Sequence, residues 1–303
     1  MDKQHIAELL DPAAISRAEA LGFHARYVVE GYMAGEHKSP YRGFAIEFAQ
    51  HREYAPGDDT RHLDWKVLAR TDRYFIKQYE QETNYVAHIL LDGSESMQYG
   101  SGKLTKLQYA KMMAACLSYL ILHQRDAVAL GIFDEQMRDF APRSNSKGTI
   151  HSIMSRLAAY QGAHRTDIAK TLHDLALQLR RKGIVIIISD FFDEEEKILE
   201  GIRHLRFGGH EVIVLHTLDV EELEFPFQGL VEFQGLENLP KVLTRPREIR
   251  ETYKKVFGEF CTKLRRGCER NHVHYVQVNT GQPLAQVLSS YLTFRLRTAK
   301  SKY

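Results

Sequence analysis

The sequence predicts an α/β fold with an open, mostly parallel β-sheet and helices on both faces, and three observations predict it. Short apolar runs alternate, after Asn84, with longer segments in which apolar residues recur at helical spacing. The run Ile-Val-Ile-Ile-Ile at 184–188 has no polar alternation, which is typical of a strand covered on both faces. The regular order of strand and helix favours crossover connections between parallel strands.

Each element of this fold is predicted from its own pattern. The strands are the apolar runs at 85–91, 127–133, 184–189, 211–217 and 273–278. The helices are the periodic segments at 6–20, 104–123, 150–160, 168–181, 194–207, 247–271 and 284–296. The least periodic segment, 219–245, is predicted to form loops, with room for a β-ribbon.

Two regions are expected along the chain. Residues 1–84 contain a short helix followed by a Gly-, Pro-, Tyr- and Arg-rich stretch from Gly31 to Asp64 that predicts short strands and turns. This region has few large apolar residues, and small cores are marginally stable alone, so we expect 1–84 to pack on the sheet domain, 85–303. Trp65, the single tryptophan, is predicted to anchor a core.

Composition excludes several classes of protein. The 303 residues carry 41 Lys and Arg against 39 Asp and Glu, so a net charge of +2 argues against a duplex nucleic-acid binder or a polybasic membrane anchor. Three cysteines are too few for a disulfide framework. The longest aliphatic run is far shorter than a bilayer span, and the N-terminus lacks a secretory h-region. We therefore expect a cytoplasmic protein without an integral membrane segment.

Oxygen-bearing side chains gather where predicted strands end. Asp92 directly follows the strand at 85–91 and precedes Ser94 and Ser96, while Asp190 follows the strand at 184–189. Thr166, in a loop just before a helix, can reach the same edge. Ligands of open α/β sheets bind beyond the carboxyl ends of the strands, so these five side chains are expected to converge.

The five predicted ligands form a hydroxyl-rich set with few carboxylates. Such a set suits Mg²⁺, or Mn²⁺, which prefers oxygen ligands and keeps several of its waters. In the Asp-x-Ser-x-Ser spacing, residues two apart in an extended loop project to one side, so Asp92, Ser94 and Ser96 can face one ion. The constellation, with Thr166 and Asp190, resembles the metal-ion-dependent adhesion site of von Willebrand factor A domains.

A second block of residues resembles a narrower family. This sequence is similar to the MoxR-associated von Willebrand factor A-like proteins, catalogued as domain of unknown function fifty-eight, over about 20–295. The shared residues upstream of the Asp92 loop are Arg42-Gly43, Glu47-Phe48, Arg52-Glu53-Tyr54, Pro56-Gly57-Asp58-Asp59, Arg61, Leu63-Asp64-Trp65, Ala69-Arg70 and Glu80, and a late match includes Gln282-Pro283-Leu284. The resemblance implies a von Willebrand A-like, Rossmann-like fold.

The same resemblance implies a function and a partner. Proteins of this family are typically encoded beside MoxR-type AAA+ ATPases, and are thought to act with them in chaperone-like maturation of, or metal insertion into, client complexes. This chain is then expected to be the adaptor, to have no catalytic residues and to bind protein through its metal, while the client stays unidentified. The alternative is a Mg²⁺-assisted, phosphatase-like hydrolase, which requires a general base near the ion.

Other motifs have simpler structural explanations. Gly100 to Lys103 lacks the earlier glycine and the following Ser or Thr of a phosphate-binding loop. The acidic run 193–196 is typical of a helix start, although a role in tuning the metal site stays open. The role of the Arg52–Arg70 block also stays open, as does whether the metal binds without a partner.

Overall fold

The computed structural model describes residues 9–20, 46–55, 63–81, 86–146, 148–162, 168–179, 182–234 and 241–300. The chain forms two compact units, Glu36–Asn84 and a larger unit made of Met1–Gly35 and Tyr85–Tyr303. Helix α2 (Pro12–Ala20) therefore belongs to the larger unit, in which it packs on α5 and α11. The packing of all of 1–84 on the sheet domain stays a prediction.

The larger unit is built on a six-stranded sheet with the strand order β10-β7-β6-β3-β4-β5. All neighbouring pairs are parallel except β4 and β5. The strands are β3 (Val86–Asp92), β4 (Ala127–Phe133), β5 (Met137–Ser144), β6 (Ile184–Ser189), β7 (Glu211–Leu218) and β10 (His274–Asn279). The predicted α/β class and its five parallel strands are confirmed. The edge strand β5 was not predicted, because its half-exposed sequence, MRDFAPRS, has no apolar run.

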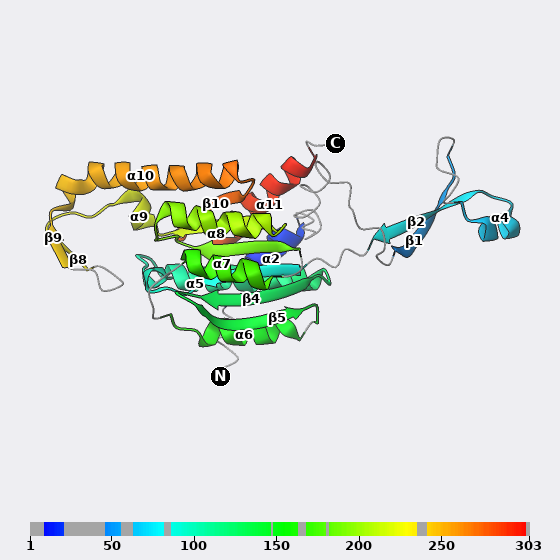
Figure 1. The fold of residues 1–303 in the computed structure, drawn as a ribbon, viewed down its shortest axis with the longest axis horizontal. Coiled ribbons are helices and arrows are strands. Elements are labelled where there is room, and N and C mark those ends of the chain that lie inside the picture. Colours follow the sequence, from blue (N-terminus) through cyan, green and yellow to red (C-terminus); the bar gives the residue numbers. More distant parts are fainter. Residues whose placement is uncertain are drawn as a thin grey trace. The chain divides into compact units, whose positions relative to one another are not determined.

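Helices cover both faces of this sheet, as predicted, and the larger unit has a hydrophobic core on each face (Figure 1). Successive residues of β3 serve different cores, since Ile89 and Leu91 pack on one face and Leu90 on the other. The first face carries α2, α5 (Lys106–His123), α6 (Thr149–Ala159) and α11 (Leu284–Lys300). The second face carries α7 (Ile168–Gln178), α8 (Glu195–Phe207) and α10 (Pro246–Arg270).

The segment after β7 contains the predicted β-ribbon and a helix that was not predicted. Strands β8 (Val231–Gln234) and β9 (Lys241–Thr244) pair in antiparallel register. The short helix α9 (Val220–Glu224) begins with a capping box. The Asp219 side chain accepts a backbone N–H from the first turn of the helix, and the Glu222 side chain accepts the backbone N–H of Asp219. This cap holds Glu222 where its carboxylate contacts Lys106.

The smaller unit is an antiparallel pair, β1 (Ile46–Glu53) and β2 (Phe75–Gln81), with α4 (Trp65–Thr71) between the two strands in sequence. Asp64 caps α4 by accepting the N–H groups of Lys66 and Val67, a structural role for part of the Arg52–Arg70 block. The prediction that Trp65 anchors a core is wrong, because its side chain is 66% exposed. Helix α4 has no buried residue, so the indole shares the exposure of the helix that carries it.

Among the described residues, no helix has both the length and the apolar character needed to cross a bilayer. The Gly- and Pro-rich positions at 31–45 and 56–62 lie outside the described residues.

Candidate metal centre

Two aspartates lie at adjoining strand ends. Asp92 is the last residue of β3, and Asp190 directly follows β6, the parallel neighbour of β3. Both side chains are buried, with Asp92 at 0% exposure and Asp190 at 4%. The carboxyl ends of β3 and β6 thus bring together two carboxylates that are 98 positions apart in the sequence, as the sequence predicted.

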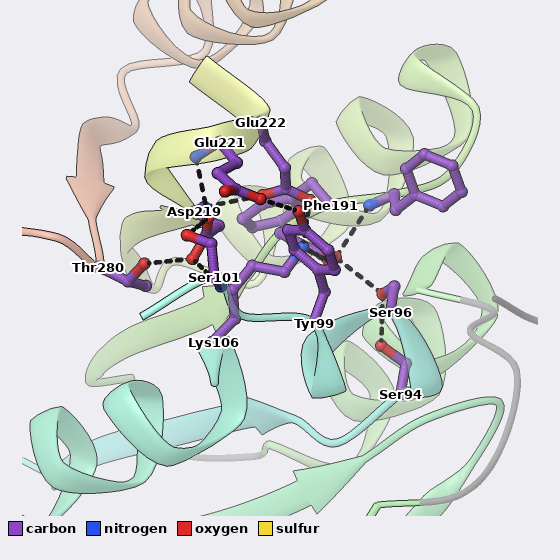
Figure 2. A network of polar contacts seen from close by, with 12 residues as sticks. Ser94, Ser96, Tyr99, Ser101, Lys106, Phe191, Asp219, Glu221, Glu222 and Thr280 are labelled. Carbon is purple, nitrogen blue, oxygen red and sulfur yellow. Dashed lines mark hydrogen bonds and ion pairs between the residues drawn. The ribbon is translucent and has the colours of Figure 1, made fainter. Parts of the chain in front are cut away.

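A hydrogen-bonded chain of hydroxyls connects the two aspartates. The Oγ atoms of Ser94 and Ser96 lie 3.0 Å apart, and Ser96 Oγ donates to Asp190 Oδ1 at 3.2 Å (Figure 2). Asp92 accepts the Ser94 N–H at 2.9 Å and the Ser189 hydroxyl at 2.6 Å. The turn of 3-10 helix η2 (Glu95–Gln98) follows Ser94 and holds Ser96 in this chain.

Four of the five predicted ligands therefore lie in one buried cluster: Asp92, Ser94, Ser96 and Asp190. The fifth, Thr166, lies outside the described residues. Its place in the site remains a prediction.

Gly93 lets a tyrosine close one side of the loop. The Tyr160 hydroxyl donates to Gly93 O at 3.0 Å. A Cβ atom at position 93 would lie 2.2 Å from Tyr160 Cε1, which is far inside van der Waals contact. The missing side chain at Gly93 is thus what allows the ring to pack against the Asp92 loop.

A buried lysine adjoins the cluster, and sequence reasoning missed it. Lys106 Nζ lies 2.7 Å from Asp190 Oδ2 and 2.7 Å from Glu222 Oε1, and the lysine side chain is 2% exposed. Lys106 is the first residue of α5. A cation at a helix N-terminus opposes the helix macrodipole, and this misplaced charge was the available sequence signal.

A second set of hydrogen bonds holds Glu222 toward Lys106 (Figure 2). Asp219 accepts the N–H of Ser101 at 3.1 Å, the Ser101 hydroxyl at 2.5 Å and the Thr280 hydroxyl at 3.1 Å. The Asp219 N–H donates to Glu222 Oε2 at 2.8 Å, so Oε1 of the same carboxylate is left for Lys106. Tyr99 donates its hydroxyl to Glu221 at 2.9 Å beside this network.

Burial shifts the pKa values of acidic and basic groups in and beside the cluster. Burial, followed by repulsion from Asp190, raises the pKa of Asp92, although hydrogen bonds from Ser189 and Ser94 oppose the rise. Burial lowers the pKa of Lys106, but Asp190 and Glu222 outweigh burial, so the net pKa is raised and the ammonium stays charged. Burial also raises the pKa of Glu222. The ammonium of Lys106 therefore pairs with two carboxylates, Asp190 and Glu222. The Asp92 carboxyl instead accepts hydrogen bonds from uncharged groups of Ser94 and Ser189.

These donors fit a hard divalent cation. The cluster offers carboxylate and hydroxyl oxygens, which are the ligands that Mg²⁺ prefers, and a nearby cation favours the ionised form of a carboxyl group. Lys106 takes Oδ2 of Asp190, whereas Oδ1 faces Ser96 within the cluster. No group of three or more His, Cys, Asp or Glu able to hold a metal occurs in the described part of the chain, so an ion here would keep several waters.

The histidine beside the cluster is already engaged. His216 Nε2 lies 2.9 Å from Asp190 O, and its Nδ1 lies 2.6 Å from the Tyr275 hydroxyl. Burial lowers the pKa of this fully buried imidazole to about 4. His216 thus has no ring nitrogen directed at the cluster with which to act as a general base.

The family follows from comparison of the sequence with known proteins. The sequence pattern described as "Protein of unknown function DUF58" matches residues 50–259. The chain belongs to this DUF58 family. Its relatives include the uncharacterized protein Rv1480 of Mycobacterium tuberculosis (strain ATCC 25618 / H37Rv), which is 27% identical over 233 residues, or 75% of this chain and 72% of the relative. The suspected family is confirmed.

Solved structures of similar fold include two with low sequence identity to this DUF58 protein. The SpRpn10 VWA domain is 12% identical, with a TM-score of 0.39 over 68% of this chain and 94% of that domain. An aerotolerance-related membrane protein from Bacteroides fragilis NCTC 9343 is 16% identical, with a TM-score of 0.46 over 72% of this chain and 99% of that one. The predicted α/β class, an open and mostly parallel sheet, is confirmed by the strand order and pairing of this chain itself.

The expected cytoplasmic location requires correction. The Bacteroides fragilis protein of similar fold is described as a membrane protein, which contradicts a cytoplasmic assignment. Composition could not have decided location, because a water-exposed domain has the same composition whether it is free or attached to a membrane.

Proposed function

We propose that this DUF58 protein is a metal-dependent, protein-binding adaptor. The observation that carries the proposal is the buried edge cluster in which the carboxyl groups of Asp92 and Asp190 lie with the hydroxyls of Ser94 and Ser96. A von Willebrand A-like fold serves protein interaction, and the cluster lies at the sheet edge where this class of fold binds its ligands.

In this proposal the chain prepares a site for Mg²⁺ or Mn²⁺. Asp92, Ser94, Ser96 and Asp190 would hold the ion, directly or through water, and Thr166 would complete the set. A bound ion supplies an open coordination position that a carboxylate of a partner protein can fill. The chain supplies the rest: two hydrogen bonds orient Asp92, and Lys106 keeps one oxygen of Asp190 turned away from the cluster.

The proposed partner is a MoxR-type AAA+ ATPase, together with a client protein. This part of the proposal rests on the family resemblance, in which the ATPase hydrolyses ATP and the adaptor recognises protein. The adaptor would serve chaperone-like maturation or metal insertion. The engaged ring nitrogens of His216 favour an adaptor over a Mg²⁺-assisted hydrolase, because a hydrolase requires a free general base near the ion.

The first experiment tests the metal by calorimetry on the full chain. We expect the parent protein to bind Mg²⁺, Asp92→Asn to lose binding while remaining folded, and Thr166→Ala to bind more weakly. Lys241→Ala serves as the control, because Lys241 lies on β9 with its side chain 59% exposed and paired to Glu232. Equal Mg²⁺ binding by the parent and Asp92→Asn would refute the metal site.

The second experiment tests the partner by surface plasmon resonance with the cognate MoxR-type ATPase. Association should require Mg²⁺, fall in EDTA and fall similarly in Asp92→Asn, with Lys241→Ala unaffected. Association that is equal in all these conditions would place the interface elsewhere, and the Arg52–Arg70 block would then be examined by substitution. Turnover of phosphate esters by the parent and not by Asp92→Asn would instead support the hydrolase.

A further inference from the structure

An open cavity of about 780 Å³ adjoins the edge cluster on the side of α10. Its floor is polar, because Lys106, Asp190 and Glu222 reach it from the cluster. Most of its wall is aliphatic or aromatic. The remaining lining residues are Phe192, Asp193, Glu194, Leu218, Ile249, Thr252, Tyr253, Val256, Phe257 and Phe260. We call this cavity the α10 groove.

One apolar stripe of α10 is covered at one end and open at the other. Leu264 and Cys268 are fully buried in the core between α10, α8 and the sheet. The same stripe continues at helical spacing toward the helix N-terminus, where Val256 is 61% exposed and Ile249 37% exposed. Figure 1 shows the first half of α10 projecting past the start of α8. Helix α8 thus covers the buried half of the stripe and leaves the half nearer the N-terminus of α10 uncovered.

The buried half of α10 packs closely on α8. A Cβ atom on Gly267 would lie 2.4 Å from Leu199 Cδ1 of α8, so this glycine lets the two helices approach closely. On the opposite wall of the groove Phe192 is 60% exposed. Exposed apolar side chains therefore face the groove from two separate elements, which is typical of an interaction surface.

The rim of the groove is acidic. Asp193 and Glu194 belong to the lining, and Glu195 and Glu196 follow in the first turn of α8. Glu194 pairs with Lys197, but both side chains are more than half exposed, and such pairs are worth little. Among the described residues that line the groove, Lys106 is the single cation, and both of its carboxylate partners lie in the floor.

We propose that the α10 groove binds a segment of a partner protein that combines apolar side chains with Lys or Arg. The apolar stripe would take the aliphatic or aromatic side chains, and the carboxylates of Asp193 and Glu194 would take the basic ones. The proposal gives the acidic run 193–196, so far explained only as a helix start, a role in recognition.

The inference rests on the adaptor role proposed above and deepens it. Asp190 belongs both to the edge cluster and to the groove floor. A partner that placed a carboxylate at the ion would therefore lay its adjoining residues in the groove. The groove itself requires no metal, so its test is separable from the test of the metal.

The probe is a fluorescein-labelled Leu/Lys peptide of about 14 residues with one apolar face, a length at which a helix becomes stable. A Leu/Glu peptide of the same length and pattern is the matched control. Fluorescence anisotropy with the full chain should show binding of Leu/Lys, with Leu/Glu at least about tenfold weaker. Equal binding of the two peptides would overturn the proposal.

Variants locate the binding. Val256→Asn should weaken Leu/Lys binding about tenfold, because a buried apolar contact is lost. Leu177→Asn, on α7 with 71% exposure, is the matched control and should bind as the parent does. Asp193→Asn combined with Glu194→Gln should weaken binding several-fold, whereas Glu232→Gln on β8 should not. Unchanged binding by Val256→Asn would overturn the proposal.

Two further arms separate the alternatives. Leu/Lys binding that persists in EDTA and in Asp92→Asn supports the groove proposal even if the chain binds no Mg²⁺. Absence of Leu/Lys binding in a protein that still binds Mg²⁺ refutes the groove proposal and leaves the metal proposal standing. Sedimentation of the full chain tests a second copy as occupant. Self-association that Val256→Asn abolishes would overturn the proposal in favour of a homodimer.

Discussion

Lys106 Nζ lies 2.7 Å from Asp190 Oδ2, and both side chains are nearly inaccessible to water. The ammonium of Lys106 thus contacts one oxygen of the Asp190 carboxylate, and the other oxygen faces the candidate metal centre. Two charges removed from water stabilise a fold only when each keeps its partners, and Lys106 has a second one in Glu222. The ion pair links α5, the end of β6 and α9 at the edge of the sheet.

Substitution of Lys106 should reveal this link. Lys106→Met keeps most of the side-chain volume but leaves Asp190 and Glu222 without their cation, so we expect a loss of about 3 kcal/mol in the free energy of unfolding. Urea denaturation measures the loss. Lys103→Met, on the loop before α5, is the control. A denaturation midpoint unchanged in Lys106→Met would show that water reaches the two carboxylates.

Gly93 should tolerate no side chain while Tyr160 is present. Gly93→Ala places a methyl group inside the tyrosine ring, so the ring must leave and its hydrogen bond to Gly93 O is lost. We expect a loss of about 1–3 kcal/mol in stability. Gly102→Ala is the control, because a Cβ atom there meets nothing within 4 Å.

A double variant tests the cause of that loss. Residues in contact give non-additive effects, so Gly93→Ala should be much less damaging in a Tyr160→Ala background. Thermal unfolding of the four proteins in the cycle measures the coupling. Strict additivity would mean that the backbone of the Asp92 loop, and not the ring, rejects the methyl group.

His88 should make the fold sensitive to acid. Burial, with smaller effects of His210 and Arg143, lowers the pKa of His88 to about 4, from an ordinary value of 6.5. Between these two values the unfolded chain binds more protons than the folded one, so stability is complete above pH 6.5 and is lost as the pH falls toward 4. The loss should reach about 3 kcal/mol.

Removal of the imidazole checks this sign. His88→Leu should flatten the dependence of the urea midpoint on pH between 6.5 and 4, while His151→Leu, at an exposed position of α6, should leave it unchanged. A slope equally steep in His88→Leu would assign the acid sensitivity to other groups.

Asp219 should hold the second hydrogen-bonded network together. Burial raises its pKa, but donors from Ser101, Glu221 and Thr280 outweigh burial, and the net pKa is lowered. Asp219→Ala leaves these donors without their acceptor, so we expect a loss of about 2 kcal/mol, measured by urea denaturation. The carboxylate's contribution should be present above its ordinary pKa of 3.8 and disappear as the pH falls below it. Ser101→Ala, which removes one donor, should cost less.

The parallel strands and the four clustered oxygen-bearing residues were predictable from the sequence. An apolar run such as 184–189 is typical of a strand in the middle of a sheet, and parallel strands end at one edge, so Asp92 and Asp190 were expected at the same edge; the pairing of β3 with β6 makes them neighbours. The edge strand β5 and the exposed Trp65 were not predictable in this way. The exposure of Trp65 and the pairing of β5 depend on which other elements lie beside them, and the local sequence does not specify those elements.

The sequence by itself determined the class of fold and the oxygen donors at the ends of β3 and β6, because both depend on periodicity and on the order of elements. Tertiary structure decided the charge balance around those donors. Lys106 and Glu222 are 116 positions apart, and although a lysine at a helix start is unusual, neither local sequence identifies the other residue as its partner. Only the packing of α5 and α9 at the sheet edge brings the two side chains together and buries the lysine, and a buried charge then acts strongly on any carboxylate in contact with it.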